Sequence, residues 1–132
     1  HALHAAGHRV RLFESEPTLG GHATTLQVGG VNVDVGHYVA AGFDPLPLLE
    51  AKHAHIYSMH LKDRKSKENG GANMPWGEGD TPIEAILQLM KKNKYKFPAT
   101  VELEYPVPEG SDAVKEVAKC VEYCRKALEK NS

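Results

Sequence analysis

IYSMHL, residues 56–61, is the stretch of this sequence that decides the fold. Its alternation of side chains predicts a β-strand. Successive side chains of a strand point to opposite faces, so Ser58 and His60 share one face. Tyr57, Met59 and Leu61 share the other. The strand therefore combines a polar face, which carries a histidine, with an apolar face that can join a core.

Helices and strands are predicted to alternate around this strand, with one helix before it and three further elements after it. Asp44-Pro45 is a cap followed by proline and opens a helix that runs to about Lys52. The later elements are a helix opened by the capping box Thr81-Pro82-Ile83-Glu84, a strand at residues 100–104, and a helix from Ser111-Asp112 to about Lys130. Such spacing is typical of βα units in a parallel sheet, which predicts the α/β class.

A glycine-rich, basic loop of 19 residues, 62–80, follows the strand. Loops of this length in compact domains are usually functional or mobile. Its basic side chains are interpreted as solvated, although the phosphate of a sugar substrate would also suit them. They are Lys62, Arg64, Lys65 and Lys67.

The last helix carries an apolar stripe at helical spacing, and the chain's two cysteines lie on it. The predicted buried stripe is Val114, Val117, Val121, Cys124 and Leu128, with Cys120 beside it. Both thiols are interpreted as packing residues, and a reactive or metal-binding pair is the alternative. His53 and His55 are expected to cap the end of the preceding helix.

Composition limits the partners. The chain has 132 residues, 41% of them apolar, and a formal net charge of -1, which suggests neither a nucleic-acid footprint nor an acidic tail. No window approaches the roughly 18 apolar residues of a membrane span. The chain begins at His1, so its true start is expected upstream. Localisation therefore stays open, with a soluble, cytoplasmic protein favoured.

Residues 1–36 resemble a segment of flavin-dependent amine oxidases, on the strength of GHRVRLFE at 7–14 and LGGH at 19–22. The resemblance implies that Glu14, at the end of a strand, binds the ribose of FAD. The matching glycine fingerprint would precede residue 1, so tight FAD binding is not expected. Two alternating runs, 26–28 and 31–35, also predict a hairpin around Gly29-Gly30.

Residues 34–132 resemble the C-terminal part of sugar phosphate isomerases and epimerases, the xylose isomerase-like TIM barrels. Four short motifs carry the resemblance, in order along the chain and at βα-unit spacing. They are DVGH at 34–37, MHLKDR at 59–64, GEGD at 77–80 and VELE at 101–104. The resemblance implies the last three βα units of a barrel.

The resemblance also implies a metal site. Asp34, His60 and Glu102 would be the metal ligands at the ends of three strands, and Glu102 would also act as the catalytic acid and base. Oxygen ligands with one imidazole suit Mn, Mg, Co or Fe. His37 and Arg64 would bind substrate oxygens, and the loop with Trp76 and Glu78 would close one wall.

Simpler interpretations of these residues stay open. Asp34 would also fit the flavoprotein-like hairpin, His60 could be a core histidine, and Glu102 could be an edge-strand charge. The family also supplies a second glutamate from an earlier strand, and residues 1–33 offer no match. Loose metal binding and weak catalysis are therefore expected of this chain, and whether it is an enzyme stays open.

The sequence thus predicts a partial (β/α) barrel at 34–132, preceded by a β-rich segment at 1–33. The predicted function is that of a fragment or fusion related to metal-dependent sugar (phosphate) isomerases or epimerases, working through a metal-stabilised enediolate. One alternative is a fragment of a flavin-dependent oxidoreductase. The other is a non-catalytic, recombined chimera that self-associates through open sheet edges.

Overall fold

A computed structural model describes residues 30–130 of the chain. Glu14, the flavoprotein-like motifs and the first arm of the expected hairpin lie outside the described residues, as does nearly all of the expected segment 1–33. The described elements are β1 (Val31–Asp34), α2 (Val35–Ala40), α3 (Pro45–Lys52), η1 (His53–His55), β2 (Ile56–Leu61), η2 (Lys67–Asn69), α4 (Ile83–Asn93), β3 (Ala99–Val101) and α5 (Ala113–Glu129).

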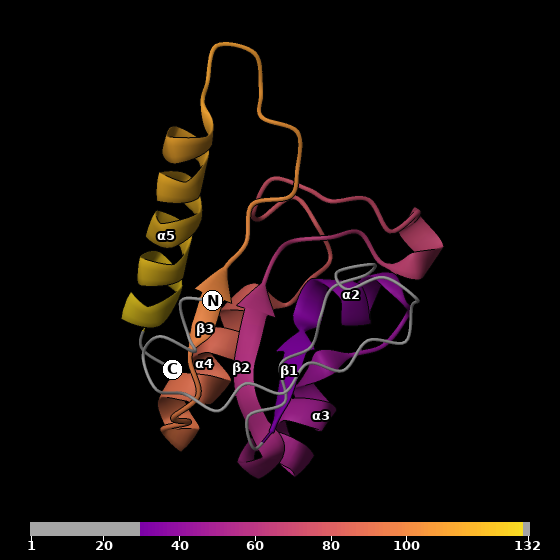
Figure 1. Cartoon of the computed structure of the whole chain (residues 1–132), viewed down its shortest axis with the longest axis vertical. Coiled ribbons are helices and arrows are strands. Elements are labelled where there is room, and N and C mark those ends of the chain that lie inside the picture. Colours follow the sequence, from indigo (N-terminus) through magenta and orange to yellow (C-terminus); the bar gives the residue numbers. More distant parts are fainter. Residues whose placement is uncertain (1–29, 131–132) are drawn as a thin grey trace, which may run out of the picture.

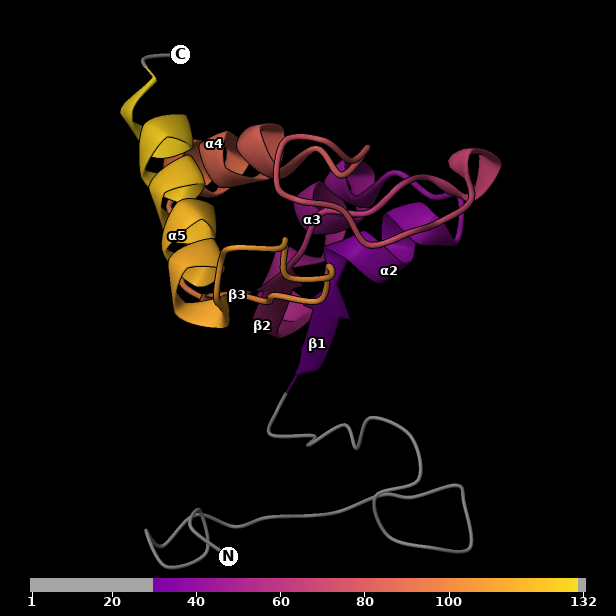
Figure 2. The same ribbon diagram turned by 90° about the horizontal axis from the view of Figure 1, so that it is seen from above.

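The three described strands form one parallel sheet in the order β1-β2-β3. Figure 1 shows α2 and α3 beside β1, and α4 and α5 beside β3. Figure 2 shows the sheet from a second direction, with α3 and α4 on the same side of it. Strands linked by helices in one parallel sheet confirm the predicted α/β class and the predicted part of a barrel.

Residues 31–34, expected as one arm of a hairpin, pair in parallel with β2. The sheet thus begins before residue 34, where the second region was expected to start. No described strand covers the outer edges of β1 and β3. Self-association through these edges stays a prediction.

The core lies between the apolar face of the sheet and the helices. Met59 and Leu61 of β2 are almost fully buried, as the alternation at 56–61 predicts. They pack with Leu49 of α3 and with Ile83 and Ile86 of α4. Because the helices cover this face, the polar side chains of the strands lie on the other one.

Two of the three predicted helix caps are confirmed. Asp44 accepts a hydrogen bond from Leu46 N at the start of α3, and Asp112 accepts one from Lys115 N at the start of α5. The capping box at 81–84 is wrong. Thr81 Oγ1 instead accepts from Arg64 N, and the Glu84 carboxylate pairs with Lys130 Nζ.

The predicted apolar stripe of α5 is wrong at three of its five positions, Val114, Val117 and Leu128. Val114 is 80% exposed, and Val117 and Leu128 are also exposed, whereas Glu116, Cys120 and Ala127 are buried. Glu116 occupies the inner face because Tyr105 and Ser111 donate hydrogen bonds to its carboxylate. Cys120 is buried and Cys124 half-buried, and burial raises the pKa of both thiols, as expected of packing residues.

β3 and the end of α3 differ only slightly from the elements predicted. The strand expected at 100–104 is shorter, Ala99–Val101, although Glu102 N still donates to Leu61 O. His53 Nδ1 lies 3.1 Å from Glu50 O at the end of α3, which fits its predicted capping role. Within residues 30–130, no helix combines the length and apolar character needed to cross a bilayer.

Candidate metal centre

Three strand ends bring together the three residues expected to bind metal. Asp34 ends β1 and is paired with His60 in the sheet register, and His60 is paired with Thr100 of β3. Glu102 lies two residues after Thr100 and therefore points to the same side of the sheet. Ligand atoms of Asp34, His60 and Glu102 all lie within 4.8 Å of one another.

The two oxygens of Asp34 have different partners. Oδ1 accepts a hydrogen bond of 2.9 Å from His37 N and so caps α2. Oδ2 lies 3.0 Å from Lys62 Nζ and 3.6 Å from His37 Nε2, on the inner side of the cluster. The cap fixes the carboxylate and leaves one oxygen facing the other candidate ligands.

Glu102 presents an oxygen that is buried without a hydrogen bond. Its Oε2 lies 3.4 Å from His60 Nδ1 and 3.1 Å from Lys62 Nζ, but neither contact has hydrogen-bond geometry. Buried polar atoms of folded proteins are normally paired, and each exception needs an explanation. A divalent cation would bind this oxygen directly, together with Asp34 and His60, so the chemistry of these residues fits a metal site.

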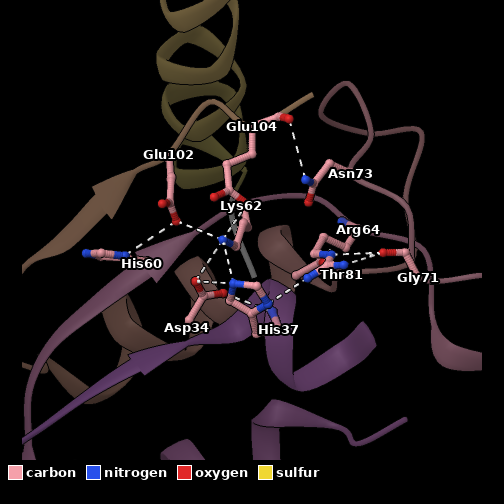
Figure 3. A network of polar contacts seen from close by, with 10 residues as sticks. All are labelled: Asp34, His37, His60, Lys62, Arg64, Gly71, Asn73, Thr81, Glu102 and Glu104. Carbon is pink, nitrogen blue, oxygen red and sulfur yellow. Dashed lines mark hydrogen bonds and ion pairs between the residues drawn. The ribbon is translucent and has the colours of Figure 1, made fainter. Parts of the chain in front are cut away.

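Lys62 lies at the centre of the cluster (Figure 3), which makes its interpretation as a solvated loop residue wrong. Its side chain is 2% exposed, and Nζ lies 2.6 Å from Glu104 Oε2 in addition to its contacts with Asp34 and Glu102. Burial alone lowers the pKa of Lys62, but the surrounding carboxylates outweigh burial and raise it. The ammonium group is therefore the cation that these acidic groups share.

His37 and Arg64, expected to bind substrate, lie next to each other at the rim of this cluster. Arg64 Nη1 lies 2.6 Å from His37 Nδ1, and Arg64 Nε donates to Gly71 O. On the other side of the ring, His37 Nε2 lies 3.0 Å from Lys62 Nζ. The His37 side chain is 59% exposed, so this rim is accessible from solvent.

The long loop reaches the cluster through other residues than those expected. Asn73 Nδ2 donates to Glu104 O, beside the site (Figure 3). Trp76 instead packs edge-on against Tyr123 of α5, with ring centroids 6.0 Å apart. Glu78 is exposed, and its carbonyl oxygen accepts a hydrogen bond from Lys65.

Two residues of the cluster, Lys62 and Glu104, were missed as site residues. The signal that could have identified them is strand parity: Lys62 follows His60 by two residues, and Glu104 follows Glu102 by two. Side chains keep alternating between the two sides of the sheet for a few residues after each strand ends. All five groups consequently face the same side of the sheet.

The fold is that of part of a (β/α) barrel, with polar side chains gathered at the ends of its parallel strands. Residues 27–126 match the family described as xylose isomerase-like TIM barrel. The chain belongs to this family.

Relatives of known name share the same region. L-ribulose-5-phosphate 3-epimerase UlaE of Escherichia coli (strain ATCC 8739) is 31% identical over 97 residues, which cover 74% of this chain and 33% of that enzyme. The enzyme of the same name from Salmonella paratyphi A is 30% identical over an equal length. The chain thus spans about a third of the length of these relatives.

A solved structure supports the fold. A xylose isomerase domain protein from Alicyclobacillus acidocaldarius superposes with a TM-score of 0.56 at 20% identity, over 75% of this chain and 37% of that one. At this identity the likeness concerns the fold alone.

Proposed function

We propose that Asp34, His60 and Glu102 bind a divalent cation and form part of a site that isomerises or epimerises a sugar or sugar phosphate. The observation that carries the proposal is the buried Oε2 of Glu102, which has no hydrogen bond and faces the other two ligands. Two carboxylates and one imidazole favour Mn²⁺, Mg²⁺, Co²⁺ or Fe²⁺.

The reaction would move a proton on the carbon next to a carbonyl group. A bound divalent cation supplies charge stabilisation for the enediolate that this proton transfer produces. Glu102 is the residue proposed to take and return the proton, because its carboxylate is held at the ligand cluster by the end of β3.

His37 and Arg64 are proposed to bind substrate oxygens. Both neighbours of the His37 ring, Arg64 and Lys62, are donors, whereas a neutral imidazole has only one acceptor nitrogen. The rim therefore has more donors than acceptors. A hydroxyl, carbonyl or phosphate oxygen of a substrate would supply the missing acceptor.

A sugar phosphate is the substrate class we favour. The named relatives are epimerases of L-ribulose 5-phosphate. This chain spans a third of their length, and the second glutamate that the family resemblance implies has no match in residues 1–33. Metal binding is accordingly the part of the proposal that this chain can test directly.

Calorimetric titration of the purified chain with Mn²⁺ tests the proposal. Stoichiometric binding is expected, and His60→Ala should weaken it by about 100-fold or more, because loss of a ligand exceeds the 10- to 100-fold cost of losing a ligand's hydrogen-bond partner. His55→Ala is the matched control, since His55 is exposed at the opposite end of β2.

Mn²⁺ binding by the two variants decides whether these residues hold the cation. Binding that is lost with His60→Ala and kept with His55→Ala supports the site. No heat of binding at millimolar Mn²⁺, or equal binding by both variants, would show that these residues do not hold the cation.

A further inference from the structure

Lys62 places a positive charge between the residues that would bind the metal. Its Nζ lies 3.0 Å from Asp34 Oδ2 and 3.1 Å from Glu102 Oε2, the inward-facing oxygens of two of the three candidate ligands. A divalent cation would need the same two oxygens at about 2.0–2.3 Å. One site cannot satisfy both partners with Lys62 in this position.

We propose that Lys62 is a built-in counter-ion that competes with the divalent cation and must move its ammonium group before the cation binds. This inference rests on the proposed metal site. Its consequence is that the metal affinity of the chain is set by a lysine that is not itself a ligand.

The side chain cannot simply leave the cluster. Lys62 is 2% exposed, and its stem packs against the first turn of α2, where a Cβ on Gly36 would come within 2.4 Å of Lys62 Cγ. Glycine at position 36 is therefore what allows the stem to lie there. The ammonium group has to find its new position inside the cluster.

Glu104 offers that position. Its Oε2 is the nearest carboxylate oxygen to Nζ, at 2.6 Å, and Glu104 does not belong to the three-residue ligand group. By keeping Glu104 and releasing Asp34 and Glu102, Nζ would free the ligand oxygens and stay paired. The charges also balance: three carboxylates, one ammonium and one divalent cation sum to zero.

Substitution of Lys62 by methionine tests the competition, because methionine keeps an unbranched stem and removes the charge. We expect Lys62→Met to bind Mn²⁺ at least ten times more tightly than the wild-type chain in calorimetric titration. Lys67→Met is the control: it removes the same charge from an exposed lysine of the same loop and should leave the affinity unchanged within twofold.

Glu104→Gln provides a reciprocal test, first in the chain that keeps Lys62 and then in the Lys62→Met background. Loss of this carboxylate removes the alternative position of the ammonium group, so we expect Mn²⁺ binding about tenfold weaker. If Glu104 acted only through its negative charge, Glu104→Gln would weaken Mn²⁺ binding equally with or without Lys62. In the Lys62→Met background we therefore expect Glu104→Gln to have much less effect.

The Mn²⁺ affinities of these variants decide whether Lys62 competes with the cation. Tighter binding by Lys62→Met, with Glu104→Gln weaker only when Lys62 is present, supports it. Equal or weaker binding by Lys62→Met overturns the competition and leaves the metal site standing. Absence of Mn²⁺ binding in both the wild-type chain and Lys62→Met overturns the metal site and the inference together. If Lys62→Met does not fold, unchanged or tighter binding by Glu104→Gln overturns it.

Discussion

Glu102 and Glu116 are two acidic residues of the same chain with opposite hydrogen-bond states. Both oxygens of Glu116 are occupied: Tyr105 donates to Oε2, and Ser111 and Lys119 donate to Oε1. Glu102, in contrast, keeps a buried oxygen without a hydrogen bond. A carboxylate with both oxygens hydrogen-bonded has little capacity left for a ligand, whereas an oxygen held only by ion pairs with Lys62 and His60 can still accept one.

The difference separates structural from functional charge in this fold. Glu116 ties the segment that follows β3 to the first turns of α5, and its partners come from both. Asp63 has a similar structural role in the long loop, where it accepts from Gly77 N, Gly79 N and Thr81 N. Substitutions at paired acids should therefore change stability, and substitutions at Glu102 should change ligand binding.

The largest stability effect is expected at Asp63. Asp63→Ala leaves three loop amides without an acceptor, among them the buried amide of Thr81, and we expect a loss of about 3 kcal/mol in the free energy of unfolding, measured by urea denaturation. Glu102→Ala should cost less than about 1 kcal/mol, because Lys62 keeps its other carboxylate partners and Glu102 is 30% exposed. Equal losses for the two variants would contradict the comparison.

A somewhat smaller effect is expected at Gly79. A Cβ at this position would lie 2.0 Å from Asp63 Oδ1 and 2.9 Å from Arg64 O. Gly79→Ala should therefore cost about 2 kcal/mol by overpacking. In an Asp63→Ala background only the close approach to Arg64 O remains, so the cost should fall, and full additivity in the same urea assay would refute the proposed clash with Asp63.

The strands and the helix starts could largely be predicted from local sequence patterns, because such patterns depend only on residues that are neighbours in the chain. The alternation at 56–61 predicted β2 with its inner Met59, and Asp44 and Asp112 predicted two helix starts. The resemblance supplied Asp34, His60 and Glu102, whose proximity is a property of the sheet register.

The errors arose where a distant partner decided the outcome. Thr81 was predicted to cap a helix, but its hydroxyl accepts a hydrogen bond from Arg64 N, 17 residues earlier in the chain. Lys62 was predicted to be solvent-exposed, because lysine side chains usually are. The carboxylates of Asp34, Glu102 and Glu104, at the ends of two strands, surround it instead. On α5, the buried face was decided by Tyr105 and Ser111, which no helical period reveals.

The smallest effect is expected in the response of Glu116 to pH. Hydrogen bonds from Lys119, Ser111 and Tyr105 lower the pKa of Glu116 from its ordinary 4.5 to about 2. Because the folded pKa lies below the unfolded one, the ionised carboxylate stabilises the fold above pH ~4.5, and this contribution is lost as the pH falls towards 2. The melting temperature of Glu116→Gln should accordingly lie below that of the wild-type chain at pH 6.

The gap should narrow by a few degrees between pH 6 and pH 3, because below about pH 4.5 the unfolded wild-type chain takes up a proton at Glu116 while the folded chain still holds the carboxylate ionised. A residual acid slope should remain in both proteins, since hydrogen bonds from Asn69 and Ser66 lower the pKa of Asp80 to about 2 as well. Glu109→Gln, at an exposed position before α5, should follow the wild-type curve. A constant gap across this range would mean that Glu116 stabilises the fold by packing and not through its charge.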